Sequence, residues 1–222
     1  VGCDLGPCLD GDACDYKTVG CEYYDAIAKA RSAPIVITNY AFWFTAAAMG
    51  TQPIGPRPFV ICDEAHAAIE ELSRFVGVEF SGAEIKLEDK LQWGLDGWRE
   101  YAKVQLPLIA DALQKCQNLR EIRLLRTMHK KLYKLTQIVD DSNWCMDAFE
   151  SKAIKFEPLW AREYVNNYIK QGAQEVSLLS ATIRPYHMDW FGVDKHSYLE
   201  LSSPFPVERR PIWWVPTVKM SR

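Results

Sequence analysis

The stretch VICDEAHAAIEEL, from Val60 to Leu72, decides the expected fold, because an apolar strand-like run changes there into a helical pattern. Two carboxylates, Asp63 and Glu64, stand at this junction, and His66 follows them. Adjacent carboxylates at the end of a buried strand are costly unless a cation or hydrogen bonds compensate them. The stretch therefore predicts either a ligand site or the acidic N-terminus of a helix.

Three apolar runs predict buried strands. They are PIVITNYAFWF at 34–44, FVIC at 59–62 and EVSLLSATI at 175–183. Between the last two, from about 82 to 172, helical patterns dominate, and segment 115–134 predicts one arm of an antiparallel helical hairpin. Strands on both sides of a long helical excursion predict an α/β fold that is interrupted by a helical insertion.

The composition of the 222 residues excludes some classes of partner. A formal net charge of −3 gives no general basic surface for nucleic acid, so local patches must supply one. No run of about 18 apolar residues and no signal-peptide pattern occurs, so we expect a cytoplasmic or nucleoid-associated protein, neither secreted nor bound to a membrane. The opening Val-Gly-Cys and closing Lys-Met-Ser-Arg lead us to expect a piece of a longer protein.

The acid pair has the chemistry of phosphoryl transfer. Side chains at the carboxyl end of a parallel strand converge on the crevice where α/β proteins bind ligands. There Asp63 can hold Mg²⁺ and Glu64 can orient or deprotonate a water, while His66 hydrogen-bonds across the site to a neighbouring element. The alternative interpretation is structural: acids complement the helix macrodipole, and Asp63 is the N-cap of a helix over Ala65–Phe75.

Ser180, Ala181 and Thr182 follow the last apolar run. Small hydroxylated side chains at a strand end can bridge an acid pair to an adjacent element without a steric cost. Alone, they equally describe an ordinary strand end followed by a turn. Two such pieces, each directly after an apolar strand, favour a shared site.

A cysteine cluster opens the chain. Four of the seven cysteines fall within the first 21 residues. This segment has no helix or strand periodicity, so it cannot form a core of its own and needs a cross-link such as a bound metal. The cluster consists of Cys3, Cys8, Cys14 and Cys21. Because the count is odd and no secretion signal occurs, the thiols predict a metal site in a reducing compartment rather than disulfides. The spacings of four, five and six residues fit neither a zinc pair nor a ferredoxin run, and free surface thiols remain the alternative.

Nucleic-acid contact is predicted from a basic arc and an aromatic segment. Segment 115–134 carries seven lysines and arginines against one acid, which favours phosphate contact over a merely solvated helix face. Aromatic side chains after Asn39 offer stacking faces for single-stranded bases, although core packing is the better interpretation for Phe42 and Trp43. The candidate DNA-contacting residues are Thr38, Asn39, Tyr40, Arg120, Arg123 and Lys130.

Five further side chains are expected in the core. Cys62 is predicted to be a small core hydrophobe on its strand. The tryptophans expected in the core of the insertion are Trp93, Trp98, Trp144 and Trp160.

These motifs resemble those of a known family. Asp-Glu-Ala-His after an apolar strand, and Leu-Ser-Ala-Thr-Ile further on, resemble motifs II and III of superfamily 2 helicases. GCEYYDAIAKARSAPIVITNY at 20–40 resembles the segment of XPD/DinG-like helicases where the last cluster cysteine precedes a helix and a Thr-Asn strand. SPFPVERRPI at 203–212 resembles their crossing towards the second motor domain, and the insertion sits where that family carries its helical Arch domain.

The resemblance implies a partial RecA-like (P-loop NTPase) motor domain in four segments. They are a cluster loop at 1–25, a motor part at 26–80, an Arch-like insertion at 81–172 and the motor return at 173–222. It makes the acid pair the Mg²⁺-binding and water-activating acids of ATP hydrolysis. It implies that His66 and the Ser-Ala-Thr run couple the state of the bound nucleotide to DNA contact. It also implies that the four cysteines are ligands of a 4Fe–4S cluster, with zinc as the alternative.

The expected function follows from this resemblance and from its gaps. No G-x-x-x-x-G-K-[ST] loop occurs in the sequence, and the second motor domain is missing, so the piece alone is expected to be inactive. The expected whole is an ATP-dependent DNA helicase, a monomeric motor that moves on single-stranded DNA and unwinds forks. The alternative is a non-catalytic, metal-stapled adaptor that binds nucleic acid or protein.

Overall fold

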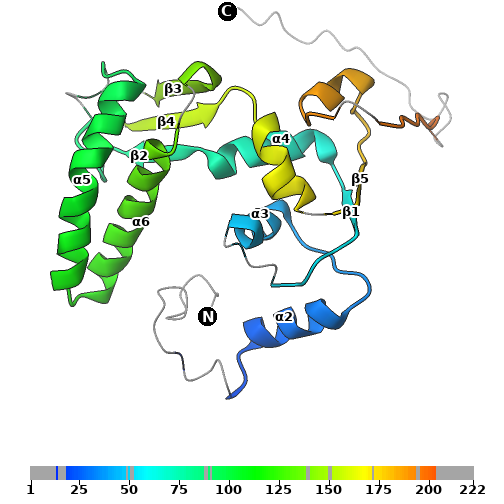
Figure 1. The fold of residues 1–222 in the computed structure, drawn as a ribbon, viewed down its shortest axis with the longest axis horizontal. Coiled ribbons are helices and arrows are strands. Elements are labelled where there is room, and N and C mark those ends of the chain that lie inside the picture. Colours follow the sequence, from blue (N-terminus) through cyan, green and yellow to red (C-terminus); the bar gives the residue numbers. More distant parts are fainter. Residues whose placement is uncertain are drawn as a thin grey trace, which may run out of the picture.

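The computed structural model describes residues 14, 19–48, 50, 53–87, 90, 92–138, 141–149, 152–171, 173–193 and 196–203. Within them the chain is a mixed α/β protein with a parallel and an antiparallel sheet (Figure 1). Most of the cysteine segment lies outside these residues. So does all but the first residue of segment 203–212, which resembles the crossing towards a second motor domain.

The parallel sheet pairs β1 (Phe59–Cys62) with β5 (Glu175–Leu178), which confirms two of the three predicted strands. Val60 lies opposite Val176 and Cys62 opposite Leu178, and all four side chains pack into one core beneath α4. Phe59 and Ile61 point to the other face, where they are 49% and 59% exposed. A parallel sheet is normally covered on both faces. Within the described residues this sheet is covered on one.

α4 (Ala65–Val76) follows β1 and runs between the two sheets (Figure 1). Its buried residues recur at helical spacing, Ala65, Ala68, Leu72 and Val76, so that one stripe of the helix faces the core. Cys62 is 4% exposed in this core, as the sequence predicts.

The strand predicted at 34–44 is wrong. Residues 34–39 form neither strand nor helix and begin with a bend at Pro34 and Ile35, and Ile35 and Ile37 are 80% and 96% exposed. The helix α3 (Tyr40–Ala48) then begins, because the Asn39 side-chain oxygen accepts a hydrogen bond from the Phe42 amide at 2.8 Å. A β-branched run becomes a strand only beside a partner strand, and none of the described residues supplies one.

α2 (Glu22–Ser32) has no buried residue and is held at its C-terminal end by arginines. The Arg57 guanidinium donates to the carbonyls of Ala30 and Ala33 at 2.6 and 2.7 Å. Arg31 donates to the Pro53 carbonyl at 3.1 Å. The two Arg57 bonds lie at the C-terminal end of α2, where carbonyls lack the amide partners they would have within the helix.

The predicted insertion, segment 81–172, contains the predicted antiparallel hairpin, formed by α5 (Leu95–Lys115) and α6 (Leu119–Thr136), but the segment is not wholly helical (Figure 1). An antiparallel sheet in the order β2–β4–β3 accompanies the hairpin. Its strands are β2 (Val78–Ser81), β3 (Trp144–Phe149) and β4 (Ala153–Pro158). Alternate residues of β4 are buried, a period of two that these six-residue strands show too briefly to stand out in the sequence.

Aromatic rings fill the core of the insertion. Phe80 stacks on Trp98 with ring centroids 5.9 Å apart, and Phe156 meets Trp98 edge-on at 5.5 Å. Trp98 is fully buried, as predicted, and Trp93 and Trp144 pack against this core.

Trp160 is the exception, because it is 54% exposed. The buried Asn143 binds its backbone in both directions, accepting from the Trp160 amide at 2.9 Å and donating to its carbonyl at 3.1 Å. This clamp fixes the backbone and leaves the indole outside the core.

Shorter helical turns complete the described elements. They are η3 (Asp141–Asn143), α7 (Arg162–Val165), η4 (Asn166–Lys170) and η5 (Pro185–Asp189).

Candidate functional site

The acid pair forms the turn between β1 and α4. Glu64 is the N-cap residue and adopts a left-handed backbone conformation, with φ 48° and ψ 46°. Asp63 does not cap the helix as the structural interpretation predicts, because its side-chain oxygen accepts from the adjacent Glu64 amide at 3.0 Å. A left-handed backbone costs a residue with a side chain roughly 1 kcal/mol or more, and such strain gathers at functional sites.

The neighbouring strand closes around this turn. The Leu179 amide donates to the Cys62 carbonyl at 2.9 Å, and the Ala65 amide donates to the Leu179 carbonyl at 2.8 Å. The chain that leaves β5 is thereby fixed against the first turn of α4. The residue after Leu179 is Ser180, so its hydroxyl arrives beside the acid pair.

His66 joins the two strand ends, as the sequence predicts. Its Nδ1 lies 2.9 Å from the Ser180 hydroxyl and 3.3 Å from a carboxylate oxygen of Glu64. The Ser180 hydroxyl in turn lies 3.2 Å from that of Thr182, with Ala181 between them. The chain of polar groups runs from Glu64 to Thr182. Glu64, His66 and Thr182 are exposed, and Ser180 is half-buried.

Tyr40 belongs to the site in a role the sequence does not reveal. Its hydroxyl donates to the Asp63 carbonyl at 2.7 Å. Burial raises the pKa of the Tyr40 phenol well above its ordinary value, and the neighbouring Cys62, Asp63 and Glu64 add to the effect. Burial likewise raises the pKa of the Cys62 thiol to about 11, so both groups stay protonated at neutral pH.

Two of the three residues predicted to contact DNA at positions 38–40 make contacts within the protein. Asn39 is engaged as the N-cap of α3, and the ring of Tyr40 stacks on Phe44 with centroids 5.8 Å apart. Thr38 is exposed. The cap could have been read from the sequence, because asparagine is among the best N-cap residues. The Tyr40 bond could not, because it depends on how α3 packs against α4, which follows the turn that contains Asp63.

The basic arc of α6 is partly structural. Lys134 donates to the Phe75 carbonyl at the end of α4 at 2.8 Å, and Lys131 pairs with Glu84 at 2.5 Å. Arg120 and Lys130 are exposed and Arg123 is half-buried, and the contact of these three with DNA remains a prediction. Lys130 borders a groove of about 600 Å³ between α6, β2 and the end of α4.

The chemistry of the acid pair fits Mg²⁺, which proteins bind through one or two carboxylates together with substrate phosphates. Asp63 and Glu64 are exposed carboxylates at the open edge of the parallel sheet. The lysine of a phosphate-binding loop is not part of this sequence.

The cysteine cluster is described only in part. Cys14 and Cys21 are half-buried free thiols, and Cys21 is the N-cap residue of α2. Cys3 and Cys8 lie outside the described residues. Thiols are the donors that Fe–S clusters and structural zinc require, so the donor type fits. No three potential metal ligands are grouped within the part of the chain that the structure describes.

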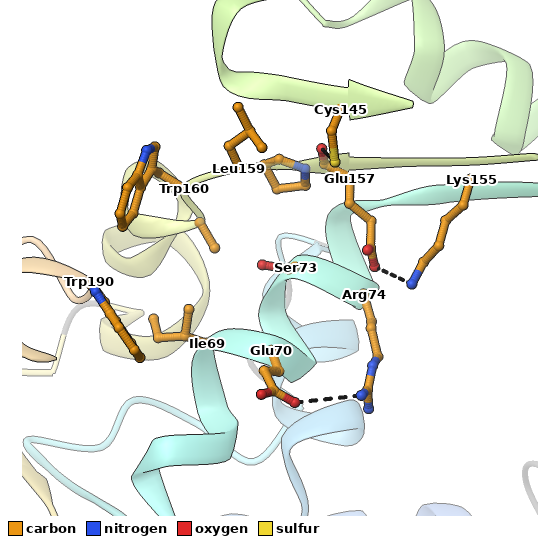
Figure 2. A pocket seen from close by; sticks show the side chains of 12 residues that line it. Ile69, Glu70, Ser73, Arg74, Cys145, Lys155, Glu157, Leu159, Trp160 and Trp190 are labelled. Atoms are coloured by element: carbon orange, nitrogen blue, oxygen red, sulfur yellow. Dashed lines mark hydrogen bonds and ion pairs between the residues drawn. The ribbon is translucent and has the colours of Figure 1, made fainter. Parts of the chain in front are cut away.

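A groove of about 510 Å³ lies beside α4, against the insertion (Figure 2). Ile69, Trp160 and Trp190 give it apolar walls. Its charged side chains pair with one another: Glu70 lies 3.6 Å from Arg74, and Lys155 lies 2.7 Å from Glu157. The cations of this groove are already neutralised, so it is not suited to the phosphates of a nucleotide.

No protein-family model matches the chain, and no curated protein shows significant similarity to it. Within the described ranges no helix has both the length and the apolar character needed to cross a membrane.

Proposed function

We propose that this chain is part of an ATP-dependent DNA helicase of the XPD/DinG-like type. The observation that carries the proposal is the 2.9 Å contact between His66 and Ser180, which joins the carboxyl ends of two neighbouring parallel strands. Ligands of open α/β sheets bind at this edge. A nucleotide bound here would touch both the acid pair and the Ser-Ala-Thr run.

The residues divide the proposed reaction between them. Asp63 would hold Mg²⁺, which would supply positive charge to neutralise the phosphates, and Glu64 would orient or deprotonate the attacking water. His66 contacts both Glu64 and Ser180, so a change at the phosphate end of the site reaches the second strand. Ser180 and Thr182 are the first groups to receive that change.

The exposed face of the parallel sheet supports a larger motor domain. Phe59 and Ile61 are half-exposed on that face, and among the described residues β5 pairs with β1 alone. Further strands and covering helices, including the phosphate-binding loop, would bury these side chains. In this proposal the hairpin and its sheet form the Arch-like insertion, the cysteines hold a 4Fe–4S cluster, and the monomeric motor binds single-stranded or fork DNA.

Glu64→Gln tests the proposal in the protein expressed from its whole reading frame. Because the amide cannot accept a proton from water, DNA-stimulated ATP hydrolysis should fall by about 10² to 10⁴-fold while nucleotide binding persists. Turnover and binding of a fluorescent ATP analogue are the measurements.

The matched control is Glu70→Gln, on the same helix and paired with Arg74. Glu70→Gln should leave turnover unchanged. Undiminished hydrolysis by Glu64→Gln would rule out the assigned role.

The second candidate is a non-catalytic adaptor with a degenerate motor fold. It is favoured by one observation, the absence of a G-x-x-x-x-G-K-[ST] loop from the sequence. It predicts salt-dependent binding of single-stranded DNA or of a protein without any ATP hydrolysis by the wild type. A phosphate-loop lysine elsewhere in the reading frame would decide against it.

A further inference from the structure

The peptide bond between Asp63 and Glu64 is held in an orientation that Glu64 itself disfavours. A rotation of this peptide changes only ψ of Asp63 and φ of Glu64, so it can return Glu64 from φ 48° to a negative φ while its neighbours stay in place. The rotated peptide would point the Asp63 carbonyl the opposite way. The rotation would break a hydrogen bond at each end of the peptide, because its N–H donates to the Asp63 side chain at 3.0 Å and its carbonyl accepts from a group outside the turn.

The group that holds it is Tyr40. The Tyr40 hydroxyl donates to the Asp63 carbonyl at 2.7 Å, the usual length for an O–H donor. The Tyr40 ring is fixed in turn, because it stacks on Phe44, which is 1% exposed, and because Asn39 caps the helix that carries both.

We propose that Tyr40 is a positioning residue for the acid pair, which anchors the Asp63 carbonyl and so keeps Glu64 in the left-handed conformation beside His66. This inference rests on the proposed function and adds to it a residue outside the Asp-Glu-Ala-His motif. It also reassigns Tyr40 from a stacking face for DNA bases to the support of the water-activating carboxylate.

The same bond links the acid pair to the exposed segment 34–39. α3 begins directly after that segment, and Tyr40 is its first residue. A ligand that moves the segment would move the anchor of the Asp63 carbonyl with it. Tyr40 thus connects the exposed segment 34–39 directly to the turn that carries the two carboxylates.

Tyr40→Phe tests the inference in the protein expressed from its whole reading frame. The variant keeps the ring and loses the bond, so kcat for ATP should fall about tenfold, with KM for ATP and the melting temperature little changed. Tyr168→Phe is the matched control, since Tyr168 lies in the same aromatic cluster around Phe44 and Phe75. The control should keep the wild-type kcat.

A second measurement does not require activity. Amide hydrogen exchange in the 222-residue chain should quicken about tenfold at Glu64 and Ala65 in Tyr40→Phe, and stay unchanged in Tyr168→Phe. In a Glu64→Gly background the effect of Tyr40→Phe should shrink, because glycine has no preference against the left-handed conformation. An equal effect in both backgrounds would assign Tyr40 a packing role and overturn the inference.

The two proposals fail in different ways. If Glu64→Gln abolishes turnover but Tyr40→Phe retains wild-type kcat and exchange, the positioning role is wrong and the proposed function stands. If the wild type hydrolyses no ATP, the proposed function is wrong, and the exchange rates alone decide whether Tyr40 holds the turn.

Discussion

The two sheets of the molecule differ in how completely they are covered. In the antiparallel sheet β2–β4–β3, the rings of Phe80 and Phe156 are fully buried against Trp98 of the hairpin. In the parallel sheet, Phe59 and Ile61 remain 49% and 59% exposed. An antiparallel sheet is stable with one face in water, whereas a parallel sheet needs both faces covered. The insertion closes its own core, and the part with the candidate site does not.

Paired isoleucine truncations should give the largest difference between the two sheets. Ile154→Ala removes a fully buried side chain of β4 and should lower the free energy of unfolding by about 2–5 kcal/mol. Ile61→Ala removes a half-exposed side chain of β1 and should cost less than about 0.5 kcal/mol in this chain. Urea unfolding measures both.

The protein from the whole reading frame sharpens this test. If further strands and helices cover the parallel sheet there, Ile61→Ala should become as costly as a core truncation. Equal costs in the 222-residue chain would contradict the exposed face.

Lys134→Met should have an intermediate effect, because Lys134 joins the two parts. Its ammonium group donates to the Phe75 carbonyl at 2.8 Å and lies 3.4 Å from the Gly77 carbonyl, at the C-terminal end of α4. A cation there interacts favourably with the dipole of α4. Its loss should lower the free energy of unfolding in urea by about 1 kcal/mol. The control Lys130→Met changes an exposed lysine one turn away and should cost less than about 0.5 kcal/mol. Equal costs would remove Lys134 as a link.

The smallest expected effect concerns acid stability within the insertion. Burial raises the pKa of Glu84, but hydrogen bonds from Lys131 and Ser81 outweigh burial and leave the pKa below its ordinary value. A carboxyl with a lowered folded-state pKa stabilises the fold above its unfolded pKa of about 4.3, and this contribution is lost as the pH falls through the folded pKa.

Between about pH 5 and about pH 3, the free energy of unfolding should therefore fall less in Glu84→Gln than in the wild type. The difference should be less than about 1 kcal/mol, because the pair is partly solvated. Thermal unfolding at the two pH values measures it. An unchanged acid slope would contradict the direction of the pKa.

The elements that could be predicted are those with a strong local signal. FVIC followed by a helical stripe fixes β1 and α4, and the long periodic pattern fixes the hairpin. The strand prediction at 34–44 is wrong because β-branched residues form a strand only beside a partner strand. Of the site, a hydrogen bond from His66 to a neighbouring element was expected, but its partner Ser180 and the left-handed Glu64 were not. Glutamate carries no preference for that conformation, which depends on the contacts of Tyr40 and Leu179.

The arginine clamp on α2 has a mechanical consequence. The helix is held at its C-terminal end by Arg57, two residues before β1, while Cys21 stands at its other end. Eleven residues of helix span about 16 Å at 1.5 Å per residue. A rotation of about 10° around the clamped end would therefore carry Cys21 through roughly 3 Å. In such a rotation Cys21 would move most, whereas Arg57 and the strand β1, which leads to the acid pair, would stay in place.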